Sequence, residues 1–502
     1  MFINVEDYGA VGDGQTKDAI AIQAALDEAI PGQAGVTVWI PEGTYILERT
    51  LYVSSNTHII AAANARLVRD HSGYLATNGR PSDSFEGYGG NSNIQFEGGI
   101  WDFNGTKQTV MHNCFAIGHG ENITFEKMEV RDVAGAHAIE VCGCRNVQIK
   151  SCQFLGFIDS GGRNFSEAVQ IDLMKGAWAF GAFGSYDHTP CENIWIMDCY
   201  FGSSSTIGSQ VWPRGIGSHS STIGRWHRNI IIANNIFEGL TMQAVRAFNW
   251  QDVSIHHNQI KHCGAGINVV SAPVSDPKDT KDVSGSQTGR SQPCHNFDIS
   301  NNIISGGLAY NHGININGEK TGVLSNVSIS NNIISDSVCT SAFSGIYIRN
   351  GDAVQVNNNI LRNIRGTAIA ASAGQHYTIT SNVILDTGGD GVKVTDSVYF
   401  IDIVSNMVRE AAYSGIVVSD HLEMVSIIGN TIAEVNRDNK KDIYHMAVTK
   451  NVNGVNISAN TCSNEKKDNK AAAVLKVSAS CKNVTRNGNN FQGLVSYDAT
   501  DS

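Results

Sequence analysis

Three carboxylates lie in two short segments of a chain that uses charged residues sparingly, at 17% of its residues. Glu167 and Asp172 fall within the run SEAVQIDLM, residues 166–174, and Glu140 falls within AIEVC, residues 138–142. Two carboxyl groups at a fixed separation can act as a general acid and a general base. We therefore expect acid–base chemistry, with Glu140 and Asp172 as the pair and Glu167 in reserve, provided that the fold brings these segments together.

Other polar and aromatic residues complete the candidate site. His219 beside Asp172 would form an oriented acid–base dyad, and Arg246 would bind a carboxylate or another anionic group. Gln170 would help these two residues to orient a ligand. Long loops on a rigid scaffold commonly carry binding sites, and flat aromatic faces suit sugar rings. The rim and the aromatic surface of the site are expected from His137, Arg214, Trp178, Trp212 and Trp226.

A repeated motif predicts the elements that position these residues. The pattern N-V-x-I-x-x-N-x-I recurs along the chain, as in NVQIKSCQF from Asn146 and NVSISNNII from Asn326. A second short strand precedes each copy, as in AVQID, residues 168–172, and GIYIR, residues 345–349. A unit of about 24 residues cannot bury its apolar face alone, so the copies are expected to stack into one parallel solenoid.

Stacking equivalent strands sets the register of the candidate site. Successive side chains of a strand face opposite ways, so Val169 and Ile171 should point to the core, and Gln170 and Asp172 should point outward. The same frame places further residues in two outward columns: Glu140, Gly217 and Arg246 with Gln170, and Cys142 and His219 with Asp172. We expect one exposed polar patch, for which a solvated, salt-bridged surface is the alternative interpretation.

The expected spacing of the carboxylates bears on the reaction. The backbones of Glu140 and Asp172 should lie about 8 Å apart, given the strand spacing and rise. That separation suits glycoside hydrolysis with inversion better than hydrolysis with retention. The Asp172 and His219 pair, with Arg246 nearby, would instead suit elimination from a uronate, in which a base removes a proton and a cation stabilises the intermediate.

Asparagine at one recurring position predicts how the coils are held together. The seventh position of the motif is Asn from Asn235 to Asn460, while the first copies have Cys152 and Cys199. Stacked amides at one bend would form a buried hydrogen-bonded ladder. The end of the solenoid needs a cover, and TKDAIAIQAALDEAI, residues 16–30, has apolar residues at helical spacing, with Thr16 as a candidate N-cap.

The expected fold class is an all-β, single-stranded right-handed parallel β-helix with this N-terminal capping helix. Residues 1–66 would form the cap and first coils, and residues 67–502 one continuous β-helix. Loop insertions are expected at residues 157–166, 173–192, 202–228 and 271–295. The last insertion is poor in apolar residues and is predicted to be a mobile loop that closes over the patch or contacts a neighbouring subunit.

Composition limits the partners and the compartment. The net charge is −11, without a basic cluster suited to phosphates, so nucleic acid is not expected as a partner. No apolar run approaches the roughly 20 residues of a membrane helix, and the N-terminus lacks the basic start and apolar core of a signal peptide. Eleven Cys residues without a C-x-x-C pair predict neither a disulfide framework nor a metal site. No cofactor is expected.

The N-terminal region carries a family resemblance. The segments VEDYGAVGDGQTKDAIAIQAALDEA and GVTVWIPEGTYIL resemble the N-terminal signature of the pectate-lyase-like superfamily, which includes polygalacturonase-like enzymes, mannuronan epimerases and phage tailspike depolymerases. The resemblance implies a right-handed parallel β-helix but not one activity, because this scaffold hosts hydrolases, lyases, epimerases and inactive binders. Neither the aspartates of polygalacturonases nor the catalytic motif of the epimerases has a match, so no site residue is carried over.

The combined expectation is a polysaccharide depolymerase similar to a phage tailspike, acting as a glycoside hydrolase on a surface or extracellular polysaccharide. A polysaccharide lyase or uronate epimerase is the second candidate, and a non-catalytic glycan-binding or structural spike is the third. The resemblance implies a homotrimer, which a separate adaptor protein would join to a virion or a cell surface. Such a chain would be made in the cytoplasm and act outside the cell, on the virion or released.

Overall fold

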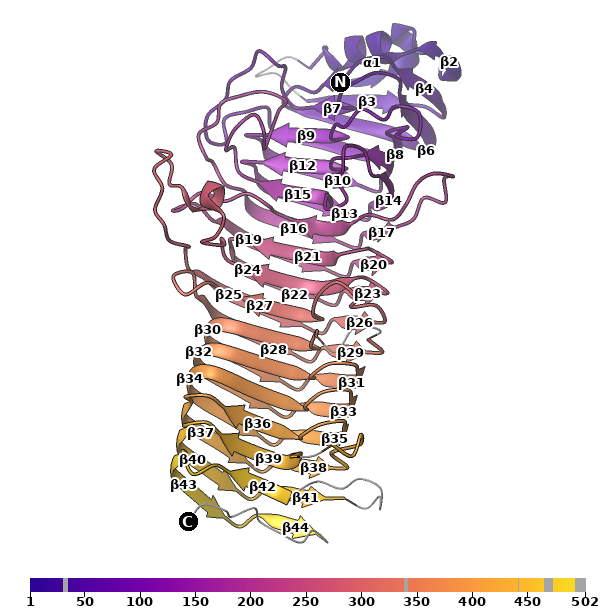
Figure 1. The fold of residues 1–502 in the computed structure, drawn as a ribbon. Coiled ribbons are helices and arrows are strands. Elements are labelled where there is room, and N and C mark those ends of the chain that lie inside the picture. Colours follow the sequence, from indigo (N-terminus) through magenta and orange to yellow (C-terminus); the bar gives the residue numbers. More distant parts are fainter. Residues whose placement is uncertain (30–34, 338–341, 441, 465–472, 493–502) are drawn as a thin grey trace. The chain divides into compact units, whose positions relative to one another are not determined.

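The computed structural model describes residues 1–29, 35–337, 342–440, 442–464 and 473–492 (Figure 1). Contacts divide the chain into unit 1, residues 1–254 and 272–290, and unit 2, residues 255–271 and 291–502. Parallel strands pair from coil to coil within each unit, which confirms the predicted all-β parallel solenoid. Among the described residues, no helix has both the length and the apolar character needed to span a membrane.

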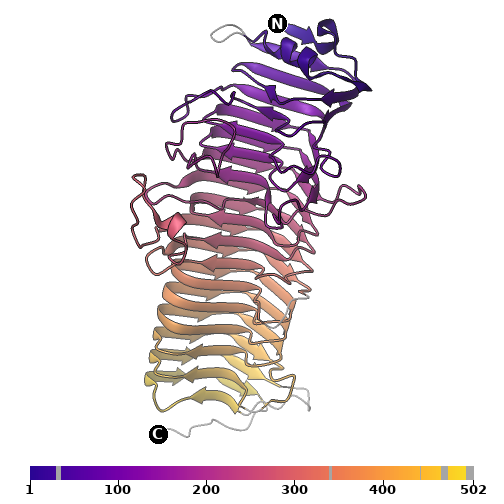
Figure 2. The ribbon, with the colours of Figure 1, turned by 45° about the horizontal axis from the view of Figure 1, so that its top comes forward.

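Three stacks of strands build unit 1 (Figure 2). The first stack carries the candidate site and contains β5 (Leu51–Tyr52), β7 (Ala76–Thr77), β9 (Phe115–Gly118), β12 (Ile139–Cys142), β15 (Glu167–Asp172), β18 (Arg214–Gly217) and β21 (Gln243–Phe248). The second contains β1 (Phe2–Asn4), β3 (Val36–Ile40), β6 (Thr57–Arg69), β8 (Ile94–Asp102), β10 (Glu121–Glu126), β13 (Arg145–Lys150), β16 (Glu192–Met197) and β19 (His227–Ala233). The third contains β2 (Asp13–Lys17), β4 (Gly43–Leu47), β11 (Glu129–Ala134), β14 (Gln153–Ile158), β17 (Tyr200–Gly202) and β20 (Ile236–Glu238), joined by the ends of β6 and β8. Strand β22 (Trp250–His256) contains the last residues of the first segment of unit 1.

Unit 2 repeats this three-stack arrangement. The first stack contains β24 (Ala265–Val270), β27 (Ile314–Asn317), β36 (Ile416–Ser419), β39 (Tyr444–Thr449) and β42 (Ala473–Val477). The second contains β25 (Cys294–Ser300), β28 (Leu324–Ser330), β37 (Glu423–Ile428), β40 (Asn453–Ser458) and β43 (Lys482–Asn487). Three long strands bend from the first stack into the second: β30 (Ile346–Asn357), β32 (Ile369–Thr380) and β34 (Val392–Val404). The third contains β23 (Gln259–Lys261), β26 (Ile303–Ser305), β29 (Ile333–Ser335), β31 (Ile360–Ile364), β33 (Val383–Thr387), β35 (Met407–Ala411), β38 (Thr431–Ala433), β41 (Thr461–Ser463) and β44 (Asn490–Gln492).

Alternating side chains fill the interior of each unit, as the strand pattern predicts. In β3, Val36, Val38 and Ile40 are buried, whereas the residues between them are partly exposed. Equivalent positions in successive coils place like side chains on one another: Phe154 stacks on Phe201 with ring centroids 4.8 Å apart. A continuous column of contacts of this kind provides the core that a single coil could not form.

The predicted asparagine ladder is confirmed in unit 2. The side-chain oxygen of Asn382 accepts hydrogen bonds from the backbone N–H and the side-chain amide of Asn359, both at 3.0 Å. The amide nitrogen of Asn382 donates to the side-chain oxygen of Asn406 at 3.0 Å and to the carbonyl of Val356 at 2.9 Å. These side chains are fully buried, so the ladder satisfies polar groups that water cannot reach.

The N-terminal helix exists but is shorter than predicted. Helix α1 spans Ala19–Leu26, and Ile22, Ala25 and Leu26 are buried. Thr16 belongs to β2 instead, so the prediction that it is the N-cap was wrong. Asp18 occupies that position, but its carboxylate accepts from the backbone N–H of Val11 at 2.7 Å rather than from the helix. Residue 30, at the end of the predicted helix, lies outside the described residues.

Candidate functional site

The predicted register of the candidate site is confirmed for Glu140, Gln170, Gly217 and Arg246, but not for His219. Glu140 lies beside Gln170 in the pairing of β12 with β15, and Gln170 lies beside Gly217 in the pairing of β15 with β18. Gly217 in turn lies beside Arg246 of β21. Strand β18 ends at Gly217, two residues before His219, so the imidazole belongs to the loop that follows the strand rather than to the strand itself.

The predicted exposure of this patch was wrong for three of its residues. Glu140 is 2% exposed, and Gln170 and Asp172 are not exposed at all. The insertion that follows β15 covers the neighbouring part of the first stack, because Phe180 and Phe183 belong to an apolar cluster with Ala116 and Cys142 of that stack. A loop expected to frame an open patch therefore covers part of it.

Asp172 is held by three donors inside the protein. Its carboxylate accepts from the backbone N–H of Leu173 at 2.8 Å, from Nε2 of Gln170 at 2.6 Å and from the hydroxyl of Ser220. A carboxylate enclosed in this way has no free surface for a sugar or a water molecule. Its contacts instead attach the start of one insertion and the loop after β18 to the end of β15.

Glu167, rather than Asp172, pairs with His219. Nδ1 of His219 lies 3.4 Å from Oε2 of Glu167 and 3.0 Å from Nε2 of Gln170. Gln170 bridges His219 and Asp172, because the same amide nitrogen contacts both residues. The expected Asp172–His219 dyad is therefore replaced by a Glu167–His219 pair. Glu167 is the first residue of β15, and His219 lies in the loop that follows β18.

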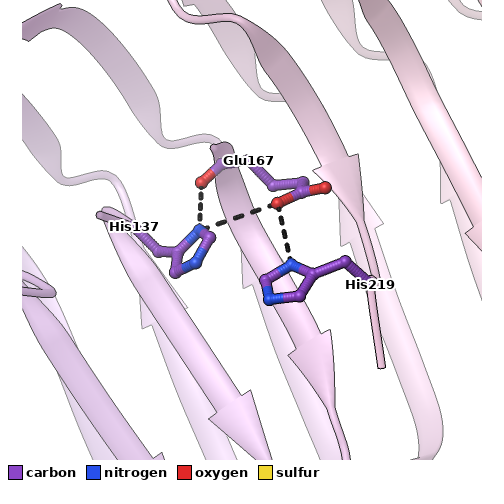
Figure 3. A group of neighbouring side chains, drawn as sticks. All are labelled: His137, Glu167 and His219. Carbon is purple, nitrogen blue, oxygen red and sulfur yellow. Dashed lines mark hydrogen bonds and ion pairs between the residues drawn. The ribbon is translucent and has the colours of Figure 1, made fainter. Parts of the chain in front are cut away.

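Glu167 is the centre of a buried cluster of charged and polar side chains (Figure 3). Nη1 of Arg214 lies 3.2 Å from Oε1 of Glu167, and Nε of Arg214 donates to Gln243 at 2.8 Å. Nδ1 of His137 donates to the backbone carbonyl of Glu167 at 2.7 Å and lies 4.0 Å from its Oε2. His137 and Arg214, expected at the rim, are thus buried inside the site.

A glycine makes room for this cluster. A side chain at Gly217 would place its Cβ 3.1 Å from Cγ of Glu167 and 3.1 Å from Cβ of Arg246. Such distances are tighter than ordinary van der Waals contact between carbon atoms. The column of outward side chains is therefore interrupted at Gly217, and the Glu167 side chain lies across the gap.

The environments of the two glutamates shift their pKa values in opposite directions. Burial, and then the negative charge of Asp172, raise the pKa of Glu140 well above its usual range. Burial also acts to raise the pKa of Glu167, but the hydrogen bond and charge of His219 and the charges of Arg214 and His137 outweigh it and lower that pKa. Burial therefore favours the protonated form of Glu140, whereas the charged neighbours of Glu167 favour its ionised form.

Two polar side chains of the site reach the surface. The His219 side chain is 27% exposed, and Arg246 is partly exposed. The guanidinium of Arg246 lies 4.6 Å from the ring centroid of Phe248 and donates to the carbonyl of Ser218. Access from solvent is therefore concentrated at His219 and Arg246, while the carboxyl groups lie behind them.

The three tryptophans expected to bind sugar differ in exposure. Trp178 is 59% exposed, and Nζ of Lys175 lies 5.5 Å from its ring centroid. Trp226 is partly buried and, with Tyr88, lines an open pocket of about 490 Å³. Trp212 is fully buried and packs against Phe157 at 5.2 Å, so the expectation that it presents a face to a ligand was wrong.

The last predicted insertion is fastened to the others. Nζ of Lys175 donates to the carbonyl of Lys278 at 2.8 Å and lies 3.5 Å from the carboxylate of Asp279. The hydroxyl of Ser221 donates to the carbonyl of Asp279 at 2.6 Å. Sequence reasoning missed Lys175, Asp279 and Gln243, because their partners come from distant loops and no spacing pattern links them.

The structure also places potential metal ligands together. One donor atom from each of His137, Glu167 and His219 lies within 4.8 Å of the other two. The three residues come from different coils, so no short sequence motif joins them.

Comparison with known proteins identifies the family. The fold and the polar site on its first stack are those of a parallel β-helix protein. A family model described as rhamnogalacturonase A/epimerase, pectate lyase-like, matches residues 2–268, more than half of the 502 residues. The chain belongs to this family. A second model, described as a right handed beta helix region, matches residues 288–462.

Individual relatives differ in what they do. Plasmin and fibronectin-binding protein A of Streptococcus pneumoniae is 31% identical over 282 residues, which are 51% of this chain and 39% of that protein. The crystal structure of this surface adhesin, PfbA, covers 87% of this chain and 91% of its own with a TM-score of 0.55 and 22% identity. Mannuronan C5-epimerase AlgE2 of Azotobacter vinelandii is 30% identical over 154 residues, 27% of this chain and 15% of that protein. The tailspike gp61 of Pseudomonas phage phi297 shares the fold, with a TM-score of 0.50, 12% identity and coverage of 86% and 80%. The chain thus spans less than half the length of both curated relatives.

Proposed function

We propose that this protein hydrolyses a glycosidic bond of a polysaccharide, with Glu140 as the proton donor and the Glu167–His219 pair as the proton acceptor. The observation that carries the proposal is the opposite shift of the two glutamate pKa values on neighbouring coils. Two carboxyl groups whose environments separate their pKa values are the arrangement that acid–base catalysis requires. A polysaccharide is the substrate class indicated by the family description.

Each residue would have a defined role in the reaction. Glu140 would protonate the glycosidic oxygen as the bond to the anomeric carbon breaks. A water molecule would add to that carbon and lose its proton to the nitrogen of His219 that faces away from Glu167. Ionised Glu167, fixed by Arg214 at 3.2 Å, would stabilise the imidazolium that forms. Arg246 would bind a carboxylate or another anionic group of the sugar.

The insertion after β15 has to move for this reaction to occur. Glu140 is only 2% exposed, and Phe180 and Phe183 pack over the neighbouring Cys142. Displacement of this insertion by the polymer would uncover the proton donor, and its return would exclude water from the site. Trp178, at 59% exposure on the same insertion, is placed to contact a sugar as the insertion opens.

A lyase or epimerase acting on a uronate is the second candidate. The observation that favours it is the exposed imidazole of His219 close to Arg246, whose guanidinium donates to the carbonyl of Ser218, the residue before His219. An imidazole could remove the proton next to the uronate carboxylate, and a guanidinium could stabilise the resulting negative charge. The third candidate, a non-catalytic glycan-binding spike, is in line with the relative named as a plasmin- and fibronectin-binding protein.

Incubation with a panel of surface and plant polysaccharides tests these candidates. Hydrolysis produces new reducing ends without ultraviolet absorbance from an unsaturated uronate, whereas a lyase produces both. An epimerase changes the uronate composition without shortening the polymer, and a binder retains the polymer and releases nothing. The proposal fails if a polymer that the protein retains yields no new reducing ends.

The same proposal includes where the protein acts and how it assembles. A tailspike-like protein would act outside the cell as a virion-associated or released homotrimer, joined by an adaptor protein to its carrier. The fold that the chain shares with a phage tailspike supports a similar scaffold for each subunit, and the trimer is part of the proposal. Light scattering of the purified chain tests it, because a stable monomer would exclude the trimer.

A further inference from the structure

We propose that His137, Glu167 and His219 form a binding site for a divalent transition-metal ion. Figure 3 shows the two imidazole rings and the carboxylate converging from three successive coils. One donor atom from each residue lies within 4.8 Å of the others. His137 and Glu167 are buried, and the His219 side chain is 27% exposed. The site therefore has enclosed ligands on one side and an entry path on the other.

The separation of the donor atoms fits a metal centre. Metal–ligand bonds of 2.0–2.1 Å in a tetrahedral arrangement place neighbouring donors about 3.4 Å apart. Nδ1 of His219 and Oε2 of Glu167 are 3.4 Å apart. His137 supplies the third donor atom, and the donor atoms of the three residues all lie within 4.8 Å of one another, so this ring has to move by up to about 1.4 Å for the same geometry.

The surrounding contacts orient these ligands before any ion binds. Arg214 takes the other carboxylate oxygen, Oε1, at 3.2 Å, which directs Oε2 toward the imidazoles. Nδ1 of His137 donates to the backbone carbonyl of Glu167 at 2.7 Å, which fixes the ring and leaves its Nε2 as the nitrogen with a lone pair. Hydrogen bonds of both kinds commonly hold metal-binding residues in place.

The donor set selects the class of ion. Two imidazole nitrogens and one carboxylate oxygen suit Zn²⁺, Co²⁺ or Ni²⁺, whereas Ca²⁺ and Mg²⁺ prefer sites made of oxygen atoms. The inference bears on the proposed function because an ion bound to Nδ1 of His219 leaves the proton of the neutral imidazole on Nε2, the nitrogen that would accept a proton from water in the proposed hydrolysis. Metal occupancy would then switch off the acid–base pair, so binding is best measured without any polysaccharide.

Co²⁺ titration of the chelator-treated full chain tests the site directly. We expect one Co²⁺ per chain with the visible absorption of a tetrahedral complex, displaced by Zn²⁺ and not by Ca²⁺. His219→Ala, which removes a partly exposed ligand, should weaken binding more than ~100-fold. Glu167→Gln keeps the size of the side chain and should have the same effect.

A second imidazole pair supplies the matched control. Nδ1 of His256 and Nδ1 of His257 are 2.9 Å apart near the surface, so this pair could capture an ion adventitiously. The double variant His256→Ala and His257→Ala should retain the Co²⁺ absorption of the unchanged chain. The site is refuted if the absorption survives in a folded His219→Ala variant, or if it disappears in the double variant. Either result leaves the proposed hydrolysis untouched, because that activity is assayed separately without added metal.

Discussion

Replacing Glu140 by Gln tests whether this side chain is a protonated acid. Burial raises the pKa of Glu140 well above its usual range, so the folded chain keeps a proton that the unfolded chain releases above about pH 4.3. Stability from this group is therefore fully present below the unfolded pKa and is lost as pH rises toward the folded pKa. The slope is at most ~1.4 kcal/mol per pH unit, so the unchanged chain should lose up to ~3 kcal/mol relative to Glu140→Gln between pH 5 and pH 7.

Urea unfolding of both chains at the two pH values measures this difference. The variant keeps an uncharged side chain of the same size beside Asn113, which contacts the carboxyl group of Glu140, so it should fold normally. Its turnover of a cleaved polysaccharide should fall by ~10²–10⁴ because the proton donor is lost. Glu86→Gln, at an exposed carboxylate, controls for the change in charge. Parallel pH dependence in the unchanged chain and Glu140→Gln would show that Glu140 is ionised, and the acid assignment would be withdrawn.

Four further substitutions test the contacts that hold the site and the solenoid. Glu167→Gln should lower the free energy of unfolding by ~3–5 kcal/mol, because it leaves the buried guanidinium of Arg214 without its counter-charge; an unchanged urea midpoint would contradict this. Asn382→Ala removes four buried hydrogen bonds and should cost ~4 kcal/mol, measured by hydrogen exchange in unit 2. Trp212→Ala should cost ~3–5 kcal/mol as a buried aromatic, whereas Trp178→Ala should change the melting temperature little; equal effects in calorimetry would contradict their assigned exposures.

Much of the fold could be predicted because it repeats. The recurring Asn and the small-apolar alternation specify where each strand lies and which face is inside. Glu140, Gln170, Gly217 and Arg246 consequently occupy the predicted register. The helix was less predictable, since Thr16 continues a strand and only local hydrogen bonding shows this.

The site could be predicted only in part, because loops and bends do not follow the repeat. Nothing in the spacing of Phe180 and Phe183 indicates that they fold back onto Ala116 and Cys142 of the first stack. The alternation of inward and outward side chains along a strand also gives no prediction beyond the strand ends, where Glu167 and His219 contact each other. Asp172→Asn should therefore destabilise the protein, because this carboxylate accepts three internal hydrogen bonds.

The ladder of unit 2 has a direction, and this constrains how such a chain can change in length. Within the ladder, Asn359, Asn382 and Asn406 each donate to the asparagine of the following coil and accept from the asparagine of the preceding one. Duplication or loss of one whole coil would preserve every donor–acceptor pairing. An insertion of half a coil would leave the buried amides on both sides of it without hydrogen-bond partners. Genes for this solenoid should therefore lengthen and shorten in steps of complete coils, while their surface loops vary freely.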